Sequence, residues 1–113
     1  MTIAELTKKA ELTSYTGTTG IKKVVTGGYI SDLLSDVMGR ATQGDIWITM
    51  QSHLNIIAIA SLRDLPAIII VNGTKPSEEM IEKAINEEIA LLGTEKGAFE
   101  TGGMIWNILN GNS

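Results

Sequence analysis

The pattern of apolar and polar residues is clearest over residues 44–73, where it predicts a strand, a helix and a second strand. Asp45–Met50 is short and rich in Ile, Trp and Thr, which is typical of a half-buried strand. An apolar helix is expected over about 53–62, and Pro66 blocks its continuation. Ala67–Val71 is almost wholly apolar and follows as a buried strand. Strands joined by such a crossover are parallel, so the pattern predicts an α/β fold.

The flanking patterns predict the remaining elements. Thr2 and Glu5 have the spacing of a capping box, which starts a short helix. A β-prone run over 22–30 is interrupted by Gly27-Gly28, which indicates a bulge or a close backbone approach. The other expected elements are a short strand near 14–16, a helix over 31–38 ended by Gly39, a helix that starts at Pro76-Ser77, an edge strand over 89–92 and a last helix over 98–109. No repeat or linker is visible, so we expect residues 1–113 to form a single small domain, with a largely parallel sheet and flanking helices.

Composition narrows the functional classes. The chain has 113 residues, of which 43% are apolar, so it is long enough for one core. A net charge of −4 and a pI near 4.9 argue against nucleic-acid binding, which needs a basic face. No run reaches the roughly 18–20 apolar residues of a membrane span, and the first residues lack the pattern of a signal peptide. The absence of cysteine excludes disulfides and thiolate chemistry. These features indicate a soluble cytoplasmic protein.

A polar turn follows the first strand of the central unit, and Asn72-Gly73 follows the second. The carboxyl ends of parallel strands meet at one edge of the sheet, where open α/β sheets hold ligands. Gly73 is expected to need a positive φ, and the start of the helix is expected to offer free N–H groups to an anion. The candidate ligand-binding residues are Gly27, Gly28, Gln51, Ser52, His53, Asn55, Asn72 and Gly73.

Catalytic and metal signatures are missing. No Walker loop or G-x-G-x-x-G follows a strand, and no nucleophile motif accompanies the acids. His53 is the only histidine, and no ligand spacing surrounds it, so we expect no metal and no cofactor. It is interpreted as a first-turn residue beside a capping Ser52. An enzyme hypothesis would instead pair His53 with Asp36 or Asp45.

The expected helix over 53–62 has almost no polar face. A helix that is apolar all round is covered on all sides, and the sheet covers only one. A second copy of the chain could cover the other side, because symmetric dimers are the commonest oligomers. The alternative is cover by the last helix, which offers Met104, Ile105, Ile108 and Leu109.

Residues 21–89 resemble the DRTGG domain family in the order and spacing of their motifs. The matching features are Thr26-Gly27-Gly28, Ser35-Asp36-Val37-Met38-Gly39, Gly44-Asp45, Ile48-Thr49, Gln51-Ser52-His53, Ala58 through Ala60, and Asn72-Gly73. Lys22-Lys23 precede the Thr-Gly-Gly, and the Asp-Arg of the family name is absent.

The resemblance implies an α/β fold similar to the amino-terminal domains of HPr kinase/phosphorylase and of Mur ligases. It also implies a non-catalytic regulatory or dimerising role, since such domains occur beside CBS domains in regulated pyrophosphatases and in some phosphotransacetylases. The first hypothesis is therefore a cytoplasmic homodimer that senses a small molecule, with an adenine nucleotide as the first ligand to test. The second is an interaction module that acts in trans on a partner enzyme through the acidic helix over 77–89.

Overall fold

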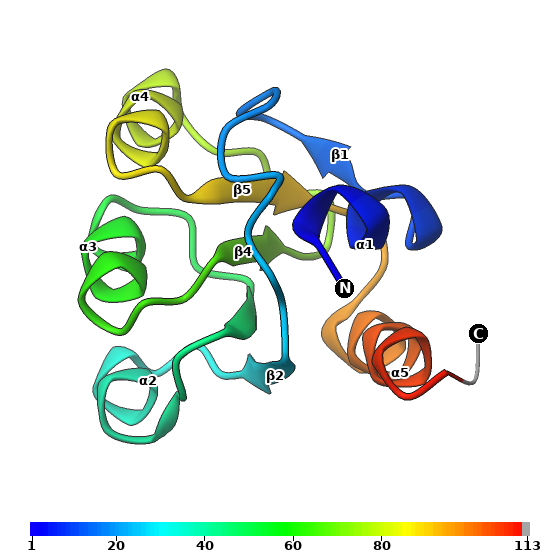
Figure 1. The fold of residues 1–113 in the computed structure, drawn as a ribbon. Coiled ribbons are helices and arrows are strands. Elements are labelled where there is room, and N and C mark those ends of the chain that lie inside the picture. Colours follow the sequence, from blue (N-terminus) through cyan, green and yellow to red (C-terminus); the bar gives the residue numbers. More distant parts are fainter. Residues whose placement is uncertain (112–113) are drawn as a thin grey trace.

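The computed structural model describes residues 1–111 and consists of one five-stranded sheet with helices on both faces (Figure 1). The elements in chain order are α1 (Ile3–Lys9), β1 (Thr13–Ser14), β2 (Gly27–Ile30), α2 (Leu34–Arg40), β3 (Asp45–Thr49), α3 (Asn55–Leu62), β4 (Ala67–Ile70), α4 (Glu78–Asn86), β5 (Ala90–Gly93) and α5 (Ala98–Leu109). The strand order in the sheet is β1-β5-β4-β3-β2. This arrangement confirms the predicted α/β class.

Strands β2 to β5 run parallel, and each lies beside the next one along the chain. Among the strands of residues 1–111, only β1 is antiparallel, and it pairs with β5 at one edge of the sheet. Helices α2, α3 and α4 form a layer on one face, whereas α1 and α5 cover the other (Figure 1). The expected crossover from β3 through α3 to a parallel β4 is confirmed.

Both faces of the sheet are covered, which explains the unbroken apolar run of β4. Ala67 and Ile69 pack under α1 and α5, while Ile68 and Ile70 pack under α2, α3 and α4. A strand buried on both faces has no polar side, so it reads as continuous rather than alternating hydrophobicity. The fully buried Trp47 packs in the apolar layer under α2, α3 and α4, and its indole Nε1 donates to the Ser31 carbonyl at 2.8 Å.

The capping box at the start of α1 is confirmed. The Thr2 hydroxyl accepts from the Glu5 amide at 3.2 Å, and the Glu5 carboxylate accepts from the Thr2 amide at 3.1 Å. The last helix also has the predicted bounds.

Several predicted bounds and positions differ from the structure, and the helix expected over 31–38 is α2, at Leu34–Arg40. The strand expected over 22–30 is limited to β2, and its two glycines pair regularly with Asp45 and Ile46 rather than forming a bulge. The close approach is present, because a Cβ at Gly27 would lie 2.7 Å from Asp45 Oδ1. Gly39 lies inside α2 rather than ending it. The strand expected at an edge over 89–92 is β5, which lies between β1 and β4.

The environment of α3 also differs from expectation. The helix starts at Asn55, and Ser52 is not its cap, because Leu54 occupies that position without a side-chain hydrogen bond. Its sides pack against α2 and α4. The alternative in which α5 covers the outer side of α3 is wrong, because α5 lies on the opposite face of the sheet. The outward residue Leu62 is 71% exposed.

Candidate ligand-binding site

The carboxyl ends of β3 and β4 lie side by side, since Thr49 is paired with Ile70. This register brings the turn 51–55 and the turn 72–73 to the same edge of the sheet. The segment after β5 joins them there: the Asn72 amide donates to the Lys96 carbonyl at 2.9 Å, and the Gly73 amide donates to the Thr94 carbonyl at 2.9 Å. Three loops therefore form one polar edge.

Asp32 links the ends of β2 and β3. Its Oδ1 accepts from the Thr49 hydroxyl at 2.7 Å and from the Met50 amide at 2.8 Å. The Gln51 side-chain amide donates to the Asp32 carbonyl at 3.0 Å, and the Gln51 backbone amide donates to the Thr49 hydroxyl at 3.1 Å. Gln51 is thus half-buried and fixed in place by the hydrogen bonds of its backbone and side-chain amides.

Ser52, His53 and Asn55 are exposed beyond this network. The Asn55 amide donates to His53 Nδ1 at 3.4 Å, and the Ile56 amide donates to the His53 carbonyl at 3.1 Å. The expectation of free N–H groups at the start of α3 is therefore wrong, because His53 accepts two of them. Its ring remains accessible to a ligand through Nε2.

Asn72 and Gly73 both have left-handed backbones, with φ of 64° and 70°. The expected positive φ at Gly73 is confirmed. The Glu95 carboxylate lies where a Cβ at Gly73 would be, so this turn and the segment after β5 pack closely. Asn72 is exposed, and its side chain is free to contact a ligand.

Gly27 and Gly28 lie elsewhere, at the first two positions of β2. They line a cavity of about 300 Å³ between β2 and α5. Because Gly27 pairs with Asp45 at the start of β3, it lies at the opposite end of that strand from Gln51. The candidate residues therefore divide into a polar edge of six residues and a separate groove that holds the two glycines.

The pairing required by the enzyme hypothesis does not form. Asp45 starts β3, whereas His53 follows its end, and the five residues of a strand span roughly 16 Å. Asp45 Oδ2 instead accepts from the Thr42 amide at 2.8 Å. Asp36 Oδ2 accepts from the Tyr29 hydroxyl at 2.6 Å, and this bond lowers the pKa of Asp36 and raises that of Tyr29.

Within residues 1–111, no group of three or more His, Cys, Asp or Glu side chains is placed to hold a metal ion. Among the helices of the same range, none has the length and apolar character to cross a bilayer.

Sequence reasoning missed part of this edge. Asp32 is not among the predicted ligand-binding residues, yet it holds Gln51 and Thr49 together. Thr94 and Lys96 also lie outside the predicted set, although their carbonyls fix the Asn72-Gly73 turn. Their position after a strand that is a neighbour of β4 is the signal that could have identified them.

Comparison with known proteins adds to this geometry. No family model matches the chain, and no curated protein matches it. The solved structure of the CBS and DRTGG domains of the regulatory region of Clostridium perfringens pyrophosphatase, complexed with its activator diadenosine tetraphosphate, has a similar fold. The TM-score is 0.72 at 19% identity, over 92% of this chain and 45% of that one. The chain thus spans less than half of that structure, and the resemblance to a DRTGG-type domain is confirmed at the level of the fold.

Proposed function

We propose that this chain is a non-catalytic regulatory domain that binds a small effector of the adenine-nucleotide class at its polar edge and works as a homodimer. The observation that carries the proposal is the similarity of its fold to a regulatory region that is complexed with a nucleotide activator. The site comprises Gln51, Ser52, His53, Asn55, Asn72 and Gly73.

The chemistry of the edge supports a polar ligand. The amides of Asn55 and Asn72 each offer two N–H donors and one acceptor, and the His53 ring can donate or accept, which is the set that reads the edge of a purine base. Gln51 is fixed by its hydrogen bonds to the Asp32 carbonyl and the Thr49 hydroxyl, so this part of the site is formed before a ligand arrives. A site formed in advance loses less conformational entropy on binding.

Calorimetric titration of the full chain with AMP, ADP, ATP and diadenosine tetraphosphate tests the proposal. We expect heat with at least one of them. His53→Ala and Asn55→Ala are expected to weaken that binding at least tenfold, because each removes exposed hydrogen-bonding groups from the edge. Asn107→Ala is the matched control, since it removes an exposed amide from α5. No heat and no thermal shift with any of the four nucleotides would refute effector binding.

The homodimer is tested independently by light scattering. A dimer mass is expected at micromolar concentration without any nucleotide. A monomer mass under those conditions would contradict this part of the proposal and leave the effector site untouched.

The acidic outer face of α4 favours a second function, that of an interaction module for a partner enzyme. Exposed acids surround the 44%-exposed Ile85 on this helix and just after it; they are Glu78, Glu79, Glu82, Glu87 and Glu88. Such a face suits a basic partner surface. Recovery of one stoichiometric partner by the wild-type chain, without nucleotide dependence and lost on substitution of these acids by Gln, would favour this function over effector sensing.

A further inference from the structure

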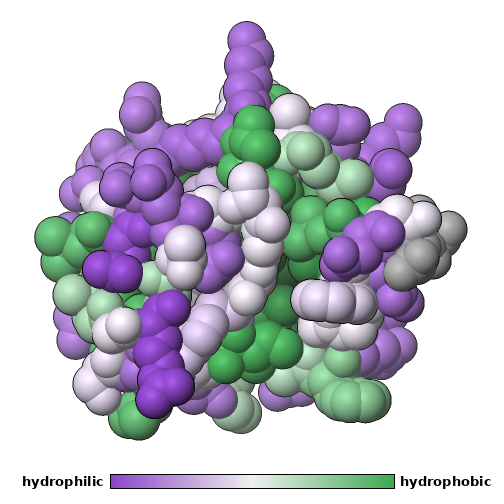
Figure 2. All heavy atoms as spheres, turned by 60° about the horizontal axis from the view of Figure 1, so that its bottom comes forward, coloured by the Kyte–Doolittle hydropathy of each residue, from purple (hydrophilic) through white to green (hydrophobic). Residues whose placement is uncertain are grey.

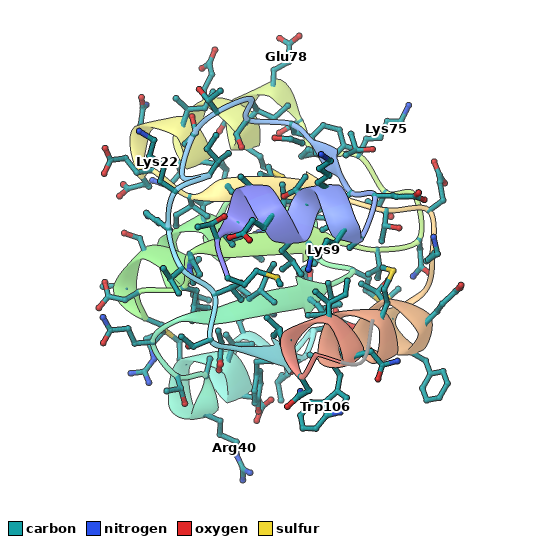
Figure 3. The ribbon with its side chains drawn as sticks, turned by 45° about the vertical axis from the view of Figure 1, so that its right-hand side comes forward. Lys9, Lys22, Arg40, Lys75, Glu78 and Trp106 are labelled. Atoms are coloured by element: carbon teal, nitrogen blue, oxygen red, sulfur yellow. The ribbon has the colours of Figure 1, made fainter. Side chains whose placement is uncertain are left out.

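The groove between β2 and α5 is lined mainly by glycine and apolar side chains, among them Ile30, Ile105 and Leu109. Figure 2 shows hydrophobic side chains gathered along it on this face. The Ile30 side chain projects over Gly102 of α5, and Ile30 remains 50% exposed. Trp106 borders the groove, is 67% exposed and points away from the molecule (Figure 3). An apolar hollow with an exposed tryptophan beside it is typical of an interface.

The strand beside the groove is an open sheet edge. β2 has β3 as its neighbour on one side and no strand of residues 1–111 on the other. Natural proteins protect such edges with charges, proline, bulges or very short strands. The opposite edge follows this rule, since β1 has two residues, whereas β2 is Gly-Gly-Tyr-Ile, with no charge, proline or bulge.

The exposed side of α5 extends the apolar surface. Phe99, Gly103 and Trp106 are spaced by four and three residues, so they share one stripe of the helix. Phe99 is 96% exposed. With Trp106 it offers roughly 250–400 Å² of aromatic surface, taking about 150–250 Å² for each full side chain. A standard interface buries about 800 Å² per partner, so two residues supply a third to a half of that area.

The absence of charged residues from the groove lining favours a second copy of the chain as the partner. None of the described residues that line the groove is charged, although the chain as a whole carries −4. Two copies would repel each other through most surfaces but not through this one. We propose that the groove between β2 and α5, with its open strand edge, is the surface through which a second copy of this chain binds. This inference rests on the homodimer of the proposed function and names its surface.

A two-fold axis beside β2 would pair the open strand edges of the two copies and bury the apolar surface beside them. An open edge carries both N–H donors and C=O acceptors, so two identical edges in antiparallel orientation satisfy each other. The same axis brings the aromatic stripe of each α5 against the partner copy. The sheet then becomes continuous across two molecules, and neither β2 edge stays open.

Cysteine cross-linking tests the surface directly, because the chain has no cysteine. A Cβ at Gly103 would meet nothing within 4 Å, so Gly103→Cys places an accessible thiol on the stripe. Ala58→Cys is the control, since it is exposed on the outward face of α3. We expect oxidation to convert the Gly103→Cys chain, and not the Ala58→Cys chain, into a covalent dimer. Cross-linking of Ala58→Cys in preference to Gly103→Cys would overturn the proposal.

Sedimentation of substituted chains gives a second test. Trp106→Lys and Phe99→Lys are expected to raise the dimer dissociation constant at least tenfold. Leu62→Lys, at a comparably exposed position on α3, is expected to change it less than twofold. A wild-type monomer at all concentrations, or dissociation by Leu62→Lys alone, would overturn the proposal. Nucleotide titration of the same chains is a separate readout, so failure of the effector site is distinguishable from failure of this surface.

Discussion

At the scale of single residues, the contact that joins β2 to α2 is a hydrogen bond from the Tyr29 hydroxyl to Asp36, at 2.6 Å. Arg40 Nε lies 3.5 Å from the same carboxylate. The hydrogen bond from Tyr29 is the main cause that lowers the pKa of Asp36 below its ordinary 3.8. The same bond, from the other side, is the main cause that raises the pKa of Tyr29 above 10.0.

These two shifts predict how stability depends on pH. Asp36 has a lowered pKa in the folded state, so its contribution is present above pH 3.8 and is lost as the pH falls through the folded value. Tyr29 has a raised pKa, so its contribution is complete below pH 10.0 and is lost as the pH rises through the folded value. Tyr29→Phe is therefore expected to lower the melting temperature between about pH 5 and 9 and to flatten both limbs of the profile.

Circular dichroism melts from below pH 3.8 to above pH 10.0 measure this effect, because both limbs of the profile lie outside the middle range. Tyr15→Phe is the control, because the hydroxyl of Tyr15 donates no hydrogen bond within the described part of the chain. If Tyr29→Phe melts at the wild-type temperature between about pH 5 and 9, as Tyr15→Phe is expected to, the contact does not contribute as described.

Local residue contacts could be predicted and distant ones could not. The capping box formed by Thr2 and Glu5 depends on a spacing of three residues, which can be read directly from the sequence. Asp32 joins Thr49 and Gln51 across two strands, and this depends on the register between β2 and β3. The candidate site was thus predictable where one turn supplies it and missed where neighbouring strands complete it.

At the scale of elements, the starts of α3 and α4 contrast. Ser77 caps α4, and its hydroxyl accepts from the Met80 amide at 3.2 Å. Ser52 has the same residue type before a helix, yet α3 starts three residues later, without a side-chain cap. Composition indicates that a helix starts nearby, but backbone geometry decides which serine caps it.

This contrast predicts different outcomes for the same substitution. Ser77→Ala is expected to lower the free energy of unfolding by about 1 kcal/mol, because it leaves a helix amide without its acceptor. Ser52→Ala is expected to change it by less than about 0.5 kcal/mol, as for an ordinary exposed position. Urea titrations of both variants measure the two values, and equal losses would contradict the assigned caps.

Element boundaries were the least predictable part of the fold. Gly39 follows the apolar residues of α2 and reads as a stop, but it continues the helix to Arg40 because its backbone remains helical. The β-prone run 22–26 stays outside β2, and its exposed Val24 forms an isolated bridge with Thr2. At Val24, pairing with a segment distant in sequence replaces the expected strand.

At the scale of the molecule, two apolar layers enclose the sheet, and the inner strands are the most protected. Amides with similar hydrogen bonds are therefore expected to exchange at different rates. The Val71 amide, after β4, donates to the Thr49 carbonyl at 3.0 Å, and the Tyr15 amide, after β1, donates to the Leu91 carbonyl at 2.9 Å. We expect hydrogen exchange at least tenfold slower at Val71, because β1 is a short edge strand that opens locally.

Exchange measured by NMR decides this prediction. Equal protection at Val71 and Tyr15 would mean that β1 opens only with the whole sheet. The predicted α/β class and the parallel direction of the central strands are confirmed, because a buried parallel strand has a distinctive apolar run. The order of strands at the edges depends on contacts between segments far apart in sequence, which the pattern does not display.

The packing of α5 against β2 has a consequence for how the chain folds as it is synthesised. β2 lies near the beginning of the sequence and α5 near its end, yet Ile105 and Ile108 complete the same apolar layer as Ile3 and Leu6. The opposite layer, under α2, α3 and α4, consists of consecutive crossovers and can assemble while the ribosome is still elongating. Until α5 is synthesised, α1 alone covers this face of the sheet, and we expect some of its isoleucines to remain exposed in that interval.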